Sequence, residues 1–315
     1  MNGGRAGGQT GAMDAKQVSD ADDGQVSDAD AEQTGVATAD ALEPALEPAL
    51  EPALEPARVD AYLRRIGAER PAEPTAEALR VLHRRHLLTV PFENLSIHLG
   101  EEIVLTDEAL IAKIVDRRRG GFCYELNGAF AALLRSLGYR VTLLQARVYG
   151  APGKLGIPYD HLALRVDTAD GVWLADVGFG AHSLYPLAFD EPGDQQDPGG
   201  VFRIEQVPNG DLDIVQNGRP EYRLDQRPRE LDEFRVGAWY HRSSPDSNFT
   251  RSLVCSRATE DGRVTLSGRQ LKIAAGGERR AAVLKTDDEV RAAYREHFGI
   301  VLDRLPDLPK RQAER

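Results

Sequence analysis

The sequence contains few cysteines, no long apolar run and no excess of positive charge, and each absence excludes a class of protein. Cys123 and Cys255 are the only two cysteines among 315 residues, too few for a disulfide framework or a four-thiolate zinc site. No apolar run approaches the ~20 residues that cross a bilayer, and no basic segment followed by an apolar stretch opens the chain. We therefore expect a cytoplasmic protein with no membrane partner and no bound metal.

The negative charge of the chain is concentrated near its N-terminus. Residues 1–57 contain twelve Asp and Glu against one Arg and one Lys, whereas residues 58–315 contain 38 acidic and 37 basic residues. Nucleic-acid binding requires a concentrated basic surface, so no nucleic-acid partner is expected. The acidic segment is also repetitive, because Gln-Val-Ser-Asp-Ala-Asp occurs at 17–22 and 25–30, and Ala-Leu-Glu-Pro occurs four times over 41–56. With regular prolines and little bulk to bury, residues 1–57 are predicted to form a disordered tail.

The hydrophobic periodicity changes twice along the rest of the chain. Over 58–144 the apolar residues recur at spacings of three and four, which is typical of a helical bundle. Over 145–260 they alternate in short runs separated by Pro, Asn and Gly, which predicts the strands of a small barrel or sandwich. Residues 261–315 combine strand-like runs with a helix at 287–298. The sequence therefore predicts an α+β fold with an N-terminal helical bundle, a central β domain and a small α/β end.

Residues 119–127, Arg-Gly-Gly-Phe-Cys-Tyr-Glu-Leu-Asn, place Cys123 where a helix should begin. The two glycines predict a tight turn, and the apolar residues that follow keep a helical period up to Gly138. A thiol in the first turn of a helix lies near unpaired N–H groups and the positive end of the helix dipole, which favours the reactive thiolate. Cys123 is therefore a candidate nucleophile, the alternative being a small buried residue of the core. Cys255, inside a strand-like run, is expected to be structural.

A cysteine nucleophile needs a base within hydrogen-bond reach and a group that orients the base. Among the seven histidines, His161 opens one strand-like run and Asp176 lies in the next. A four-residue loop at 167–170 pairs Val166 with Gly171. In that register His161 lies directly opposite Asp176 on the same face, whereas a one-residue slip separates them. Asp176 is thus the candidate orienting group, the alternative being a cap of the turn that follows it.

Several polar residues near these candidates are expected to support the site. Arg119 and Glu125 flank the cysteine and are expected to form an orienting ion pair rather than to take part in the chemistry. Asn127 lies one helical turn after the cysteine and is likewise expected to support the site. His83 and His86 lie on a predicted helix with apolar neighbours and are expected to pack or to face solvent.

The motif around Cys123 resembles the active-site signature of the arylamine N-acetyltransferases. The spacing also agrees, because 38 residues separate Cys123 from His161 and 15 separate His161 from Asp176, as in the Cys–His–Asp triad of that family. The resemblance covers about 58–300 and is most specific over 86–180. Further matching segments are Tyr-Leu-Arg-Arg-Ile-Gly at 62–67, Val-Pro-Phe-Glu-Asn-Leu at 90–95 and Asp-Val-Gly-Phe-Gly at 176–180.

The resemblance implies a fold and a reaction. It implies a helical bundle carrying Cys123, a β-barrel carrying His161 and Asp176, and an α/β lid, with the triad arranged as in cysteine proteases. It also implies ping-pong transfer of an acetyl group from acetyl-CoA, a co-substrate, to Cys123 and then to an arylamine or arylhydrazine, as in xenobiotic metabolism, without a permanently bound cofactor. His161 then accepts the proton of the amine. The residues expected to contact substrate are Phe179, Val148 and Phe92.

Three other functions stay open at this point. An amide synthase that closes a macrolactam keeps the same triad but takes a carrier-bound acyl thioester and an aryl amine. A cysteine hydrolase, such as a peptidase, uses the triad to deliver water. A non-enzymatic scaffold would bind a partner through its acidic tail, and its Cys123 would react with alkylating agents no faster than a free thiol.

Overall fold

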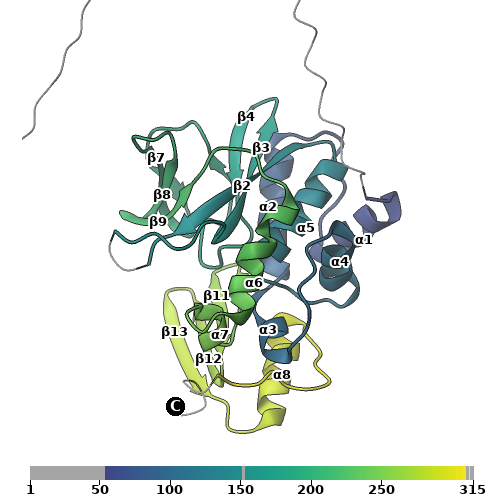
Figure 1. Cartoon of the computed structure of the whole chain (residues 1–315). Helices are drawn as coiled ribbons and strands as arrows, with labels where there is room; N and C mark the ends of the chain where they lie inside the picture. Colours follow the sequence, from purple (N-terminus) through teal and green to yellow (C-terminus); the bar gives the residue numbers. More distant parts are fainter. Residues whose placement is uncertain (1–53, 151–152, 310–311, 313–315) are drawn as a thin grey trace, which may run out of the picture. The chain divides into compact units, whose positions relative to one another are not determined.

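The computed structural model describes residues 54–150, 153–309 and 312, which belong to one compact unit (Figure 1). The disordered tail predicted over 1–57 lies almost entirely outside these residues. At its end, Leu54 donates its backbone N–H to Ser136 Oγ at 2.9 Å, and helix α1 already begins at Pro56. Proline suits the first turn of a helix because the N–H group there has no intrahelical partner.

The first layer of the fold is helical, with α5 at its centre. Every residue of α5 from Cys123 to Leu134 is buried, because the other helices and the barrel cover all its faces. Thr75 and Thr106 start the flanking helices, since each side chain accepts a backbone N–H of the first turn. The helical elements are α1 (Pro56–Ile66), α2 (Ala76–Thr89), α3 (Leu95–Leu99), α4 (Asp107–Ile111), a π-helical turn (Ala112–Asp116) and α5 (Cys123–Ser136).

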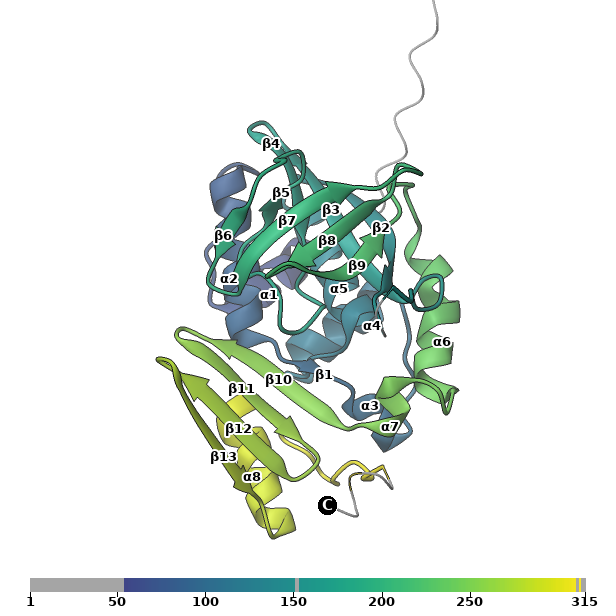
Figure 2. The ribbon, with the colours of Figure 1, turned by 90° about the vertical axis from the view of Figure 1, so that its left-hand side faces the viewer.

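The second layer is an antiparallel sheet of eight strands in the order β5-β4-β3-β2-β9-β8-β7-β6. Its outer strands are joined by a side chain: Gln195 of β6 accepts the backbone N–H of Ala188 in β5 at 2.7 Å and donates to the Ala188 carbonyl at 2.9 Å. The sheet is therefore a nearly closed barrel (Figure 2). Its strands are β2 (Arg140–Val148), β3 (His161–Thr168), β4 (Gly171–Ala175), β5 (Leu187–Ala188), β6 (Gln195–Asp197), β7 (Gly200–Gln206), β8 (Leu212–Gln216) and β9 (Arg219–Leu224).

Helices interrupt the region 145–260, for which only strands were predicted. A 3₁₀ turn (Leu231–Phe234) leads into α6 (Arg235–Ser243), and α7 (Asn248–Arg251) follows. Phe234 and Ala238 pack into the same core as α5, so α6 covers the helical layer after the chain has left the barrel.

The third part contains a five-stranded sheet and α8 (Asp287–Phe298), which matches the helix predicted at 287–298. Leu266 and Val264 of the sheet bury one face against Tyr294 and Phe298 of α8. The sheet begins with β1, which comes from the helical region and pairs with β10. Its strands are β1 (Phe92–Glu93), β10 (Val254–Thr259), β11 (Gly262–Ser267), β12 (Gln270–Ala275) and β13 (Glu278–Val283). The predicted α+β fold is confirmed.

Candidate active site

Cys123 is the first residue of α5 and is 4% exposed, so the predicted helix start is confirmed. The reason for the two preceding glycines differs from the expected tight turn. A Cβ on Gly120 would lie 1.8 Å from the Pro91 carbonyl oxygen, and one on Gly121 would lie 2.6 Å from Glu125 Cβ. The glycines therefore let the loop pack closely against its neighbours.

Two buried ion pairs hold this loop, but not the pair predicted between Arg119 and Glu125. Arg119 donates to Glu93 at 2.9 Å, and Lys113 donates to Glu125 at 2.6 Å. The second oxygen of Glu125 accepts the Phe122 N–H at 3.2 Å and so caps the start of α5. Burial alone would raise the pKa of Glu93, but the charges of Arg119 and Lys113 lower it to about 2. Neither partner was predicted from the sequence, because Glu93 lies 26 residues from Arg119 and Lys113 lies 12 residues from Glu125, in a different helical element.

His161 and Asp176 meet at the end of the barrel that faces α5. Nε2 of His161 lies 2.7 Å from Oδ2 of Asp176, and both residues are 2% exposed. The register that predicted this contact was wrong, because Gly171 pairs with Thr168 and not with Val166. The shift is two residues, and an even shift keeps every side chain on its face. Asp176, directly after β4, therefore still reaches His161, from a diagonal position.

Four hydrogen bonds converge on the Asp176 carboxylate. Oδ2 accepts from His161 and, at 3.1 Å, from the Tyr222 hydroxyl. Oδ1 accepts from Asn127 Nδ2 at 2.9 Å and from the Gly178 N–H at 3.0 Å. Burial would raise the pKa of Asp176, but the charge and hydrogen bond of His161 hold it well below its usual range. The carboxylate is therefore ionised.

The pKa of His161 shifts in the opposite direction. Burial would lower it, but the charge and hydrogen bond of Asp176, followed by those of Cys123, raise it well above its usual value. Because Nε2 is hydrogen-bonded to Asp176, Nδ1 is the nitrogen left for the hydrogen bond with the Cys123 side chain. The structure thus brings together the three predicted triad residues from α5, β3 and the end of β4.

Asn127 connects the helix to the barrel. Besides Asp176, its Nδ2 donates to the Leu162 carbonyl at 2.6 Å, and its Oδ1 accepts the Val177 N–H at 2.9 Å. A Cβ on Gly178 would lie 2.8 Å from the Cys123 Cα. The barrel loop and the first turn of α5 are therefore in direct contact.

Two residues of this network were not predicted, His83 and Tyr222. His83 of α2 is fully buried; its Nε2 accepts the Asp176 N–H at 3.1 Å, and its Nδ1 donates to the Leu184 carbonyl at 3.0 Å. Burial lowers the pKa of His83, which suits an imidazole that accepts an N–H. Its position on the apolar face of a helix indicated packing, as expected, but gave no signal for this contact.

The three predicted substrate contacts lie around the triad and are each half-buried. The ring centroid of Phe179 is 5.1 Å from that of His161. Val148 ends β2 and pairs with Tyr222 of β9. Phe92 forms a bridge with Gly121, two residues before the cysteine. Cys255 is fully buried in β10, where burial raises its pKa, and is structural as expected.

No group of His, Cys, Asp and Glu in the described part of the chain is arranged to hold a metal ion. Among the same residues, no helix combines the length and apolar character needed to cross a membrane.

The raised pKa of His161 predicts a pH dependence of stability, best measured in the Cys123→Ala background, where no thiol titrates at the site. A histidine whose pKa is higher in the folded than in the unfolded protein stabilises the fold. This stabilisation is fully present below the unfolded pKa of about 6.5 and is lost as the pH rises through the folded pKa. The free energy of unfolding should fall by up to about 1.4 kcal/mol per pH unit above pH 6.5. In Cys123→Ala with Asp176→Asn, the groups that raise the pKa of His161 are gone while burial still lowers it, so this fall should vanish. Urea unfolding from pH 6 to 9 measures both; equal slopes would contradict the assigned charge pair.

Comparison with known proteins agrees with this geometry. The N-acetyltransferase family model matches residues 75–306. An arylamine N-acetyltransferase of Mycolicibacterium smegmatis is 34% identical over 266 residues, which cover 80% of this chain and 96% of the relative. An arylamine N-acetyltransferase / N-hydroxyarylamine O-acetyltransferase of Salmonella typhimurium is 37% identical over 215 residues, 66% of this chain and 75% of the relative.

Solved structures show the same similarity. The arylamine N-acetyltransferase of Mycobacterium marinum, solved in complex with CoA, superposes with a TM-score of 0.70 at 33% identity, covering 77% of this chain and 92% of that one. The protein is thus an acyltransferase. The chain belongs to the arylamine N-acetyltransferase family.

Proposed function

We propose that Cys123, His161 and Asp176 are the catalytic triad of an arylamine N-acetyltransferase that uses acetyl-CoA. The observation that carries the proposal is the 2.7 Å contact between His161 and Asp176, with the thiol at the other side of the imidazole and at the start of a helix. The CoA complex of the M. marinum relative supports CoA as the carrier of the donated group.

The geometry supports a two-stage reaction. The Cys123 thiolate attacks the thioester carbonyl, the carbon–sulfur bond to CoA breaks, and the imidazolium of His161 protonates the departing CoA thiolate. The acceptor nitrogen then attacks the acetyl-cysteine. Neutral His161 takes the amine proton as the Cys123 thiolate leaves, which restores the starting pair. Asp176 holds the imidazole in one orientation and stabilises its charged form in both stages.

We further propose that Phe179, Val148 and Phe92 contact the aromatic ring of the acceptor. The proposal is supported by their half-buried side chains next to the triad and by the arylamine acceptors named for the relatives. We also predict a cytoplasmic location and a role in xenobiotic metabolism. Which arylamine or arylhydrazine accepts the acetyl group stays a prediction as well.

Intact-mass analysis tests the proposed function. With acetyl-CoA and no amine, the protein should gain the mass of one acetyl group, and peptide mapping should place it on Cys123 and not on Cys255. Adding an arylamine should remove the adduct and yield one acetylated amine for each adduct lost. Parallel incubations with propionyl-CoA and malonyl-CoA would define the range of donors. An unmodified Cys123 with all three donors would contradict the proposal, and reaction only with a carrier-bound acyl chain would indicate an amide synthase.

A further inference from the structure

Tyr159, two residues before His161, adopts a backbone conformation that few side chains tolerate. Its φ is +58°, and in the described part of the chain only Arg118 and Asn217 are other non-glycine residues with positive φ. The left-handed region is unfavourable for a bulky side chain. Residues persist there only where their surroundings hold them, and they concentrate at active sites. The contacts of Tyr159 should therefore explain both what holds it and what it does.

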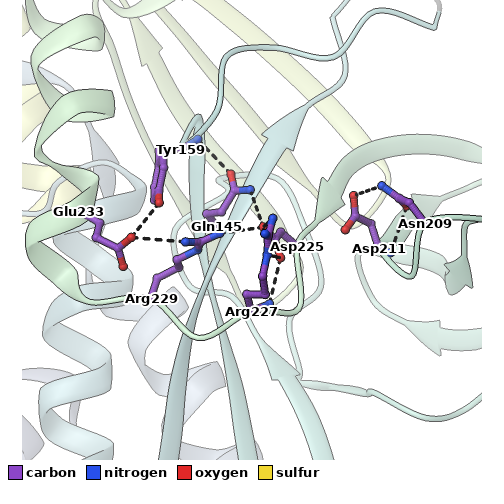
Figure 3. A network of polar contacts seen from close by, with 8 residues as sticks. All are labelled: Gln145, Tyr159, Asn209, Asp211, Asp225, Arg227, Arg229 and Glu233. Atoms are coloured by element: carbon purple, nitrogen blue, oxygen red, sulfur yellow. Dashed lines mark hydrogen bonds and ion pairs between the residues drawn. The ribbon is translucent and has the colours of Figure 1, made fainter. Parts of the chain in front are cut away.

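Side chains of β2 and of the segment 229–234 hold Tyr159 (Figure 3). Its backbone N–H donates to Gln145 Oε1 at 3.0 Å, and its hydroxyl donates to Glu233 Oε1 at 2.8 Å. The guanidinium carbon of Arg229 lies 5.4 Å from its ring centroid, and Arg229 also pairs with Glu233 at 3.4 Å. The Phe234 ring packs edge-on against it at 5.4 Å. Tyr159 is thus fixed at its backbone, its ring and its hydroxyl.

The carbonyl of Tyr159 makes the contact that matters for the site. It accepts a hydrogen bond of 2.5 Å from the hydroxyl of Tyr124, the residue after Cys123. One hydrogen bond therefore joins the residue that follows the thiol to the residue two before His161. Helix α6 closes over this bond, because a Cβ on Gly237 would lie 2.3 Å from the Tyr159 carbonyl oxygen and 2.4 Å from the Tyr124 hydroxyl.

We propose that the Tyr124–Tyr159 hydrogen bond and the left-handed backbone of Tyr159 position His161 against Cys123 for acyl transfer. Asn127 holds the helix to the barrel on the Asp176 side, through Leu162 and Val177. The Tyr124–Tyr159 hydrogen bond holds α5 to the barrel on the side where β3 begins. Both tyrosines are positioning residues that act through Cys123 and His161. This inference rests on the proposed function, because it concerns the same thiol and imidazole.

The test compares Tyr124→Phe with Tyr139→Phe. Tyr139 is also buried and also donates its hydroxyl to a backbone carbonyl, that of Thr75 at 3.0 Å, but it lies outside the site. Tyr124→Phe should lower the maximal single-turnover rate of Cys123 acetylation by about tenfold or more, with the half-saturating acetyl-CoA concentration unchanged. It should also change the pH dependence of Cys123 alkylation by iodoacetamide. Tyr139→Phe should leave both readouts unchanged; equal behaviour of the two variants overturns the proposal.

A second pair of variants tests the backbone of Tyr159. Tyr159→Asn and Tyr159→Val remove the same ring and hydroxyl, but Asn tolerates positive φ and a β-branched residue does not. The Asn variant should acetylate Cys123 at least about fivefold faster than the Val variant. Equal rates in the two variants would show that the left-handed backbone of Tyr159 does not position His161. Alkylation needs no acetyl donor. A wild type that resists acetylation, combined with altered alkylation in Tyr124→Phe, would refute the proposed function while leaving the positioning role intact.

Discussion

Asp176→Asn should lower the rate of Cys123 acetylation by about 10⁴-fold while the fold stays intact. Asp176 Oδ1 accepts the N–H groups of Asn127 and Gly178, so the amide oxygen of the variant must take this place, because an amide nitrogen accepts no hydrogen bond. The amide nitrogen then faces Nε2 of His161 and donates to it. The imidazole proton is forced onto Nδ1, the nitrogen that serves Cys123, and the thiol has no base.

A quenched time course of the acetyl adduct, read by intact mass, measures this loss. Asp167→Asn is the matched control: it removes a carboxylate from the same strand as His161, where Asp167 pairs with Arg165 at 3.1 Å. The control should react at the wild-type rate, and both variants should keep the wild-type circular dichroism spectrum. An Asp176→Asn rate within about tenfold of the wild type would show that the carboxylate does not set the imidazole tautomer.

Helices and strands that show a clear local pattern of apolar residues could be predicted from the sequence. Helix α8 was predicted with its observed bounds, Asp287 to Phe298, and in the structure Thr286 caps its first turn. Cys123 was placed at a helix start from the same kind of pattern. By contrast β13 was missed, because all its residues from Glu278 to Val283 are exposed and it has no buried alternation. Such a strand is defined by pairing with β12, which no local pattern shows.

The contacts within the site depend on pairs that are distant in sequence. His161 and Asp176 were brought together through the wrong register, and the prediction succeeded because a two-residue shift keeps the faces unchanged. Lys113 and Glu93, which neutralise Glu125 and Arg119, gave no local signal. A buried charge requires a partner, so burial of the motif implied that partners exist. Their identity depends on how the helices pack.

Gly178 shows how closely the barrel must approach the helix, and Gly178→Ala should lower the acetylation rate by about 10²-fold. The added Cβ would lie 2.8 Å from the Cys123 Cα, 3.0 Å from the Cys123 carbonyl oxygen and 2.7 Å from Asn127 Nδ2. Backbone atoms of a buried helix cannot move aside as a flexible side chain can. The loop after β4 must therefore shift away from α5, and Asp176 and His161 move with it.

Misplacement of the triad must be separated from loss of folded protein, since overpacking of this kind costs about 1–3 kcal/mol of stability. The acetylation rate should therefore be measured at saturating acetyl-CoA, well below the melting temperature, and divided by the folded fraction from circular dichroism. Gly150→Ala is the matched control, because among the residues that the structure describes its Cβ would meet nothing closer than the Lys154 carbonyl oxygen at 3.9 Å. The control should retain the wild-type rate. A folded Gly178→Ala protein with an acetylation rate within about threefold of the wild type would contradict this prediction. It would mean that the loop accommodates the Cβ without moving His161, so that its contact with α5 does not set the reactive geometry.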